Sequence, residues 1–334
     1  MHPGGFSRGA LLFPALLLVN GTATASQNPQ EPPQTIRIQV ERVNVGVIVT
    51  DAHGQFVEGL RREDFHLFDN GAEQPLTDFA TVEEPGQVLL LIEAGPAVYL
   101  LEGGHLQAAL SLLNGLSAGD RVAVVKYAEA PQALLDFTAD KQAVAASFDQ
   151  LRFNLGFGSL NLSSSVSNVL EWLAHVRGKK TIVLLSTGVD TSPPNERAKV
   201  LQQLKTGDVR LLAVSLAGGL QDAPPSNKKK TTAKNPAQPV PQFAQANQLL
   251  KQMAEAAGGR AYFPANEKEF SAAYAEIPQL VRHEYSLAFT PPTRDGAVRA
   301  IEVRIDPPQT SAPNFASAIY RLDHRQAYVA PAPQ

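Results

Sequence analysis

Alternating apolar residues mark the first part of the chain that the sequence predicts to fold. The alternating positions are Ile36, Ile38, Val40, Val43, Val45, Val47 and Val49. This period of two is typical of half-buried strands. Asp69-Asn70-Gly71 indicates a hairpin, because Asn-Gly readily adopts the positive φ angles of tight turns. Residues 35–84 are therefore predicted to be β-rich, with a strand at Gln74–Phe79 closing the hairpin.

From Gln87 onward, continuous apolar runs are separated by helical stretches. The runs at Val88–Ile92, Thr181–Leu185 and Val209–Val214 are typical of strands covered on both faces. Further strands are predicted at 121–127 and 133–137, and helices at about 105–116, 141–151, 162–176, 197–204, 243–257 and 267–281. This alternation predicts an α/β fold, a doubly wound and mostly parallel sheet.

The β pattern returns after His283. Strands are predicted at Glu284–Phe289, Val298–Ile305 and Ser317–Leu322. Two β-rich ends around an α/β centre predict that the ends pair with each other, so that the α/β domain is inserted in a small β-sandwich. The predicted division is residues 35–84 and 283–328 for the sandwich and 87–282 for the α/β domain.

Residues 218–242, within the α/β domain, are rich in Pro, Lys, Asn and Gln. This composition has too little apolar surface to form a core, so the segment is predicted to be a mobile loop. Its cationic side chains are Lys228, Lys229, Lys230 and Lys234.

The N-terminus has the layout of a secretory signal peptide. Arg8 precedes the apolar run 10–19, and the small residues Ala23-Thr24-Ala25 follow. The run is about half of the ~20 residues that a membrane-spanning helix needs; a buried or interfacial helix is the alternative. Residues 1–26 are predicted to be the signal peptide, cleaved near Ala25 or Ser26, and residues 27–34 a disordered leader. We therefore expect a secreted or periplasmic bacterial protein with no transmembrane segment after cleavage.

Composition narrows the class of protein. Apolar residues make up 44% of the 334 residues and charged residues 18%, as in ordinary globular proteins with a packed core. The formal net charge of -3 gives no general attraction to nucleic acid. The chain has no cysteine, so its stability must come from its core, without disulfides.

Four groups of short segments, taken in order, carry a resemblance to a known family. They are Val47-Ile48-Val49-Thr50-Asp51 with Gly54, Gly59-Leu60, Asp64-Phe65, Asp69, Gly71 and Gln74; Leu91-Ile92-Glu93-Ala94-Gly95; Val183 to Asp190; and Glu284-Tyr285-Ser286-Leu287 with Arg325-Gln326-Ala327-Tyr328. Residues 87–282 resemble the von Willebrand factor A domain. The whole mature chain is similar to the VWFA-related family found in many copies in acidobacterial genomes.

The resemblance implies a metal-ion-dependent adhesion site at the carboxyl edge of the sheet, built from a D-x-S-x-S loop, a Thr and a later Asp. Mg²⁺ requires such hard oxygen ligands. This sequence departs from that pattern at every position. Glu93 stands at the first Asp, Gly95 and Ala97 at the two Ser, Leu160 at the Thr and Thr187 at the later Asp. We therefore expect a degenerate site with no metal and no cofactor.

Polar residues are nevertheless predicted to converge at that edge, since the carboxyl ends of parallel strands meet there. The candidate partner-binding face comprises Glu93, Gly95, Ser159, Asn161, Thr187 and Asp190. The lysine-rich loop would leave from the same edge as a cationic flap suited to an acidic partner. The alternative is that these residues cap helices and that the loop is a tolerated insertion.

No constellation for catalysis is found. The sequence lacks the G-x-S-x-G nucleophile elbow and the H-E-x-x-H zinc motif, so the protein is predicted not to be an enzyme. The predicted function is that of an exported, adhesion-type module that binds another protein or a cell-envelope component without Mg²⁺. The alternatives are a structural unit of an envelope complex, a metal-dependent adhesion domain and a cryptic hydrolase.

Overall fold

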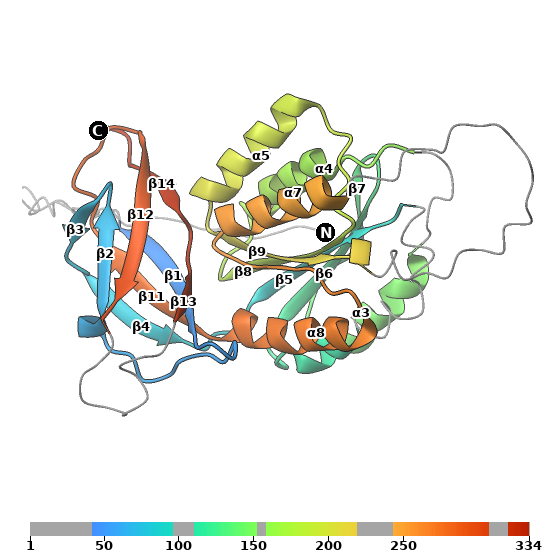
Figure 1. Ribbon diagram of the computed structural model, residues 1–334, viewed down its shortest axis with the longest axis horizontal. Coiled ribbons are helices and arrows are strands. Elements are labelled where there is room, and N and C mark those ends of the chain that lie inside the picture. Colours follow the sequence, from blue (N-terminus) through green and yellow to red (C-terminus); the bar gives the residue numbers. More distant parts are fainter. Residues whose placement is uncertain (1–41, 96–109, 152–157, 219–242, 307–319, 334) are drawn as a thin grey trace, which may run out of the picture. The chain divides into compact units, whose positions relative to one another are not determined.

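A computed structural model describes residues 42–95, 110–151, 158–218, 243–306 and 320–333 (Figure 1). The predicted signal peptide, the leader, the alternating positions 36–40 and the four lysines of the cationic loop lie outside the described residues.

A six-stranded sheet forms the centre of the fold, in the order β10-β9-β8-β5-β6-β7. Its strands are β5 (Gln87–Glu93), β6 (Arg121–Tyr127), β7 (Pro131–Thr138), β8 (Lys180–Ser186), β9 (Val209–Ser215) and β10 (Ala261–Tyr262). All neighbours pair in parallel except β6 and β7, which are antiparallel. The carboxyl ends of the parallel strands therefore lie at one edge of the sheet, and their amino ends at the other.

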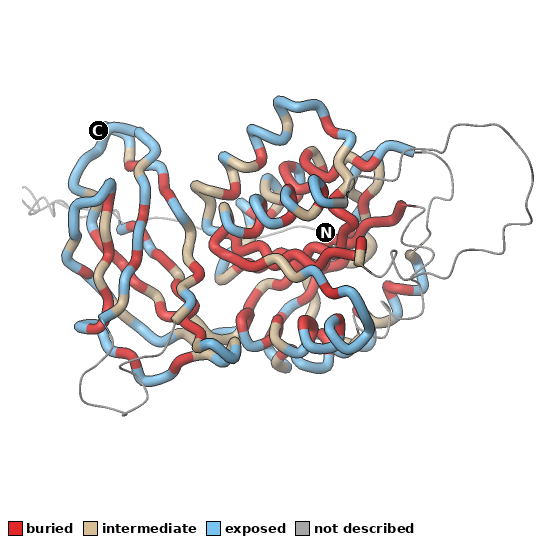
Figure 2. Tube along the Cα trace, viewed as in Figure 1, coloured by how far each residue is buried: buried red, intermediate tan, exposed pale blue. Residues whose placement is uncertain are grey.

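Helices cover both faces of this sheet (Figure 1). One face packs against α3 (Lys141–Ser147), α8 (Glu267–Arg282) and the helical residues 110–115, and the other against α4 (Leu162–Leu173), α5 (Pro194–Thr206) and α7 (Phe243–Ala256). Val88, Leu90 and Ile92 of β5 belong to the first core, and Leu89 and Leu91 to the second. Burial on both faces explains why Val88 to Ile92 are all apolar, and Figure 2 shows the same burial, in red, for the central strands of the sheet.

Two four-stranded sheets combine segments from both ends of the described chain. Their orders are β13-β1-β11-β4 and β14-β12-β2-β3. The strands are β1 (Val43–Thr50), β2 (Phe65–Asp69), β3 (Ala72–Gln74), β4 (Asp78–Val82), β11 (Glu284–Phe289), β12 (Val298–Ile305), β13 (Arg321–Asp323) and β14 (Ala327–Val329). Every pairing within these sheets is antiparallel. Side chains from both sheets form one apolar core, and we call the two sheets the antiparallel sheet pair.

The predicted fold class is confirmed: a mostly parallel α/β sheet is accompanied by antiparallel sheets from both chain ends. The hairpin turn is also confirmed, since Asn70 has φ 48° and Gly71 φ 81°. The short η1 (Arg62–Asp64) and η2 (Phe148–Gln150) turns precede β2 and follow α3.

The predicted strand Gln74–Phe79 is wrong, because two strands of different sheets divide it. β3 ends at Gln74, and Pro75 follows, which has no backbone N–H to continue a ladder. The Thr77 N–H then donates to Ala288 O at 2.7 Å, which brings the chain to β11 and the other sheet. The predicted strand at 317–322 is described only from residue 320 and forms β13 at Arg321–Asp323.

Two buried arginines join the α/β sheet to the antiparallel sheet pair. Arg260, just before β10, donates from Nε to Asp323 Oδ2 at 2.5 Å, from Nη1 to Glu276 Oε1 at 2.5 Å and from Nη2 to Thr50 Oγ1 at 2.7 Å. Arg210 on β9 donates from Nη1 to Glu284 Oε2 at 2.9 Å. These bonds connect the amino-terminal half of β9 and the approach to β10 with β1, β11 and β13.

Among the helices that the structure describes, none combines the length and the apolar character needed to cross a membrane.

The Arg260 junction yields a stability prediction. Replacing Asp323 by Ala leaves a guanidinium that is 6% exposed with one carboxylate fewer. Breaking a buried ion pair costs about 3–5 kcal/mol. The free energy of unfolding of Asp323→Ala should fall by an amount near the lower end of this range, because Glu276 still pairs with Arg260. Urea unfolding followed by far-UV circular dichroism measures the loss. The matched control is Glu302→Ala, whose partner Arg304 is exposed; an equal loss in both variants would contradict the prediction.

Candidate functional site

Glu93 is the centre of a buried hydrogen-bond network at the carboxyl edge of the sheet. It is the last residue of β5 and has no exposed surface. Its carboxylate accepts hydrogen bonds from Tyr127 Oη at 3.2 Å, Ser186 Oγ at 3.0 Å, Thr187 N at 2.8 Å and Thr187 Oγ1 at 2.9 and 3.0 Å. Ser186 Oγ also lies 2.7 Å from Tyr127 Oη and accepts from Gly188 N at 2.9 Å. The ends of β5, β6 and β8 are thus tied to one carboxylate.

Burial sets the protonation of this network. Desolvation raises the pKa of Glu93 above its ordinary value of 4.5, although the hydrogen bonds from Thr187 and Ser186 act in the opposite direction. Burial, followed by the nearby Glu93 charge, raises the pKa of Tyr127 well above its ordinary value. The Tyr127 hydroxyl therefore keeps its proton and remains a hydrogen-bond donor at neutral pH.

Gly95 and Leu160 are complementary in shape. A Cβ atom at Gly95 would lie 2.8 Å from Leu160 Cδ2 and 3.3 Å from Glu93 Oε1. Leu160 is buried, with 9% of its surface exposed. A serine at position 95 would therefore require the leucine to move.

Asp190 holds the beginning of α4. Its Oδ1 accepts from Ser163 N at 3.2 Å and Ser192 N at 3.0 Å, and its Oδ2 accepts from Ser163 Oγ at 2.5 Å. The side chain is 1% exposed, and Arg197 Nη2 lies 3.7 Å from Oδ2. Asp190 thus satisfies the free N–H of Ser163 in the first turn of α4 and adds a negative charge at the positive end of the helix dipole.

Asn161 and Thr191 fix the backbone beside that helix. Asn161 Nδ2 donates to Glu129 O at 2.9 Å, while its Oδ1 accepts from Thr191 Oγ1 at 3.0 Å. Leu160 N donates to Thr191 Oγ1 at 2.9 Å, and Thr191 N to Leu160 O at 2.7 Å. Ser159 precedes this bonded pair and is exposed, as is Thr191.

The six positions singled out from the sequence have different environments in the structure. Glu93 and Thr187 bond directly, and Gly95 packs beside them. Asp190 is buried at the start of α4, Asn161 is partly exposed and Ser159 is exposed. Sequence reasoning missed the roles of Tyr127 and Ser186, although each ends a strand next to β5; shared position at one sheet edge was the signal that could have found them.

Among the described residues, no group of three or more His, Asp or Glu side chains is placed to hold a metal ion.

Comparison with known families identifies the class of protein. Residues 105–275, more than half of the chain, match the von Willebrand factor type A domain. The chain therefore belongs to the von Willebrand factor type A domain family. No curated protein matches it.

Solved structures show similarity at low identity. An aerotolerance-related membrane protein from Bacteroides fragilis is 14% identical, covering 59% of this chain and 98% of that one, with a TM-score of 0.46. A von Willebrand factor type A protein from Catenulispora acidiphila is 12% identical, covering 80% of this chain and 74% of that one, with a TM-score of 0.46. The vWF domain of the type V pili tip protein Mfa5 from Porphyromonas gingivalis is 13% identical, with coverages of 60% and 96% and a TM-score of 0.40.

The raised pKa of Glu93 predicts a pH-dependent stability difference. Below about pH 4.5 the group is protonated in both the folded and unfolded states, and its stabilising contribution is fully present. As pH rises, Glu93 ionises first in the unfolded chain, which stabilises the unfolded state. Its stabilising contribution to the folded state is therefore lost as the pH rises through the raised pKa that Glu93 has in the folded protein. Gln cannot ionise. The free energy of unfolding of the wild type minus that of Glu93→Gln should therefore fall as pH rises from about 4.5. Denaturant unfolding at several pH values measures this difference, and a constant or rising difference would contradict it.

Proposed function

We propose that the protein is an exported, non-catalytic binding module that recognises another protein or a cell-envelope component through the carboxyl edge of its α/β sheet, without Mg²⁺. Membership of the von Willebrand factor type A family supports a binding role by analogy. The observation that carries the metal-free part is that Glu93 and Asp190, the two carboxylates of the candidate face, are buried and already hydrogen-bonded within the protein.

The described residues do not fit a Mg²⁺ ion. Mg²⁺ demands several hard oxygen ligands in near-octahedral geometry. Glu93 accepts hydrogen bonds at both carboxylate oxygens, and Asp190 accepts at both of its own. Leu160 presents a hydrocarbon where the family pattern has a hydroxyl. Binding an ion would require these bonds to break, so we infer that the site is degenerate.

The same burial supports a non-catalytic role. A general acid or base must reach the proton that it transfers. The Glu93 carboxylate has no exposed surface, and the Asp190 side chain is 1% exposed. Among the described residues, Ser159, Thr191 and the partly exposed Asn161 present neutral polar groups at this edge. We propose that these three residues contact the partner, while Glu93, Gly95, Thr187 and Asp190 hold the edge in shape.

The proposal also includes export of the protein and the division of the chain into two domains. The N-terminal segment supports a signal peptide at residues 1–26 and a secreted or periplasmic location. The strands that make up each sheet support the predicted division into domains. Residues 35–84 and 283–328 would together form a β-sandwich, and residues 87–282 would form the domain inserted in it.

Metal independence is tested by calorimetric titration of the chelator-stripped full chain with Mg²⁺ and then Mn²⁺. The expected result is no saturable heat and no change in melting temperature, because the edge carboxylates are already satisfied. Titration of EDTA with Mg²⁺ under the same conditions confirms that the assay detects binding. Saturable uptake near one ion per chain would overturn the metal-free proposal.

The binding edge is tested by replacing Ser159 with a photo-crosslinking amino acid in the host that makes the protein. Ser159 is exposed at the carboxyl edge, whereas Glu302, the matched control, is exposed on β12 of the antiparallel sheet pair. A discrete adduct from position 159 and none from position 302 is expected. The adduct should form in the extracytoplasmic fraction on a chain that lacks residues 1–25 or 1–26. Adducts from both positions, or none from 159, would contradict the assignment.

A further inference from the structure

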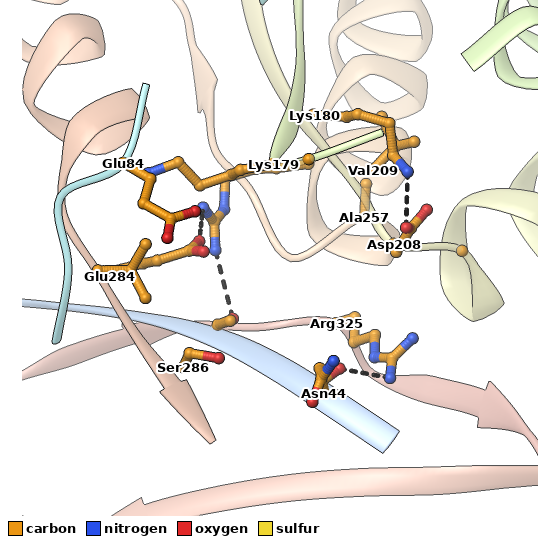
Figure 3. A pocket seen from close by; sticks show the side chains of 15 residues that line it. Asn44, Glu84, Lys179, Lys180, Asp208, Val209, Ala257, Glu284, Ser286 and Arg325 are labelled. Atoms are coloured by element: carbon orange, nitrogen blue, oxygen red, sulfur yellow. Dashed lines mark hydrogen bonds and ion pairs between the residues drawn. The ribbon is translucent and has the colours of Figure 1, made fainter. Parts of the chain in front are cut away.

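A polar pocket lies at the opposite edge of the α/β sheet, against the antiparallel sheet pair (Figure 3). Its volume is about 320 Å³. Lys179 and Lys180 line it from the beginning of β8, Arg210 from β9, and Arg325 from the segment between β13 and β14. Asn44 of β1 is also part of its wall. Four cationic side chains therefore face one pocket.

Two of these cations are balanced by carboxylates. Lys180 Nζ lies 2.7 Å from Asp208 Oδ2, and Arg210 Nη1 lies 2.9 Å from Glu284 Oε2. The second pair is buried on both sides, with side chains 8% and 12% exposed. Gly46 allows this pairing, since a Cβ there would lie 2.8 Å from Glu284 Oε2. These pairs leave little charge for a ligand to neutralise.

Lys179 and Arg325 are not balanced in this way. Lys179 Nζ donates to the Arg282 carbonyl at 2.8 Å, and Arg325 Nη2 to the Asn44 carbonyl at 2.6 Å. Within the described part of the chain, neither cation has a carboxylate at ion-pair distance, and Arg325 Nε is buried without an acceptor. Burial lowers the pKa of both groups. The charges of Glu284 near Lys179 and of Asp208 near Arg325 act in the opposite direction, but not at ion-pair distance. A desolvated cation without a direct ion pair is costly, so an anion in the pocket would be favoured.

We propose that this pocket binds a ligand with two separated carboxylate groups, one near Lys179 and one near Arg325. Figure 3 shows these side chains on different sides of the pocket, Lys179 towards Glu84 and Arg325 beside Asn44. One compact anion would serve one cation, whereas two linked carboxylates serve both. The volume equals that of about ten water molecules at ~30 Å³ each, which suits a short aliphatic dicarboxylate.

The remaining carboxylate of the pocket does not exclude such a ligand. Glu84 is exposed, and water and salt screen its charge more than they screen the buried groups. Ser286 and the Asn44 side chain also line the pocket and offer neutral donors for carboxylate oxygens. The same chemistry occurs in a free dicarboxylate and in two acidic side chains of a partner segment. The pocket lies at the amino edge, so this proposal is independent of the partner face around Ser159.

The test is calorimetric titration of the full chain with glutarate, adipate and pimelate, with hexanoate as the monocarboxylate comparison. A single saturable site is expected for at least one dicarboxylate, with weaker binding of hexanoate. Lys179→Gln and Arg325→Gln should each weaken binding about tenfold or more, since each removes a hydrogen bond to a charged group. Lys199→Gln, which removes an exposed lysine of α5, should leave binding unchanged.

An acetylated Glu-Ser-Glu amide distinguishes the two sources of the ligand. Tighter binding of this peptide than of every dicarboxylate assigns the pocket to an acidic partner segment, and the reverse order assigns it to a free dicarboxylate. If Arg325→Gln does not fold, Lys179→Gln and the charge-preserving Arg325→Lys decide the question. Absence of binding by all probes, equal binding of hexanoate, or unchanged binding by Lys179→Gln overturns the proposal.

Discussion

The fold depends on one buried cation, Arg260, placed between the α/β sheet and the antiparallel sheet pair. Its guanidinium is 6% exposed, so water cannot stabilise its charge, and only protein partners can. Those partners are Thr50, Glu276 and Asp323, which lie on β1, α8 and β13. The cation is satisfied only when all three segments are in place. The two ends of the chain are therefore held to the central sheet by a directional charge cluster as well as by apolar packing.

This junction determines which edge of the α/β sheet the antiparallel sheet pair covers. Arg210 adds a second connection at the amino edge, where its Nη2 donates to the Gly46 carbonyl at 3.3 Å and Nη1 to Glu284. Arg325 similarly donates to the Asn44 carbonyl. Two arginines thus donate hydrogen bonds to carbonyls of β1 that could otherwise accept hydrogen bonds from another strand. The antiparallel sheet pair occupies the amino edge, and Ser159 and Thr191 stay exposed at the carboxyl edge.

The sequence predicted what depends on local pattern and missed what depends on distant side chains. The apolar run of β5 and the Asn70-Gly71 turn could be predicted because periodicity and backbone preference act over a few residues. The Arg260–Asp323 pair joins residues 63 positions apart, and no local pattern identifies one arginine as the buried one. The same limit applies to the site. The position of Glu93 at the end of a strand was predictable, but its bonds to Tyr127 and Ser186 depend on strand order.

The carboxyl edge is best understood as having a reversed polarity. A bound Mg²⁺ is a positive centre surrounded by oxygen acceptors. Here the centre is the Glu93 carboxylate, and the hydroxyl and N–H groups around it act as donors. The substitutions are mutually consistent, because Leu160 fills the space that a side chain at position 95 would need. Thr187 supplies two donors where an aspartate would bring a second negative charge beside Glu93. A buried carboxylate with these donors can hold three strand ends together without an ion, which is the physical basis for the metal-free binding edge that we propose.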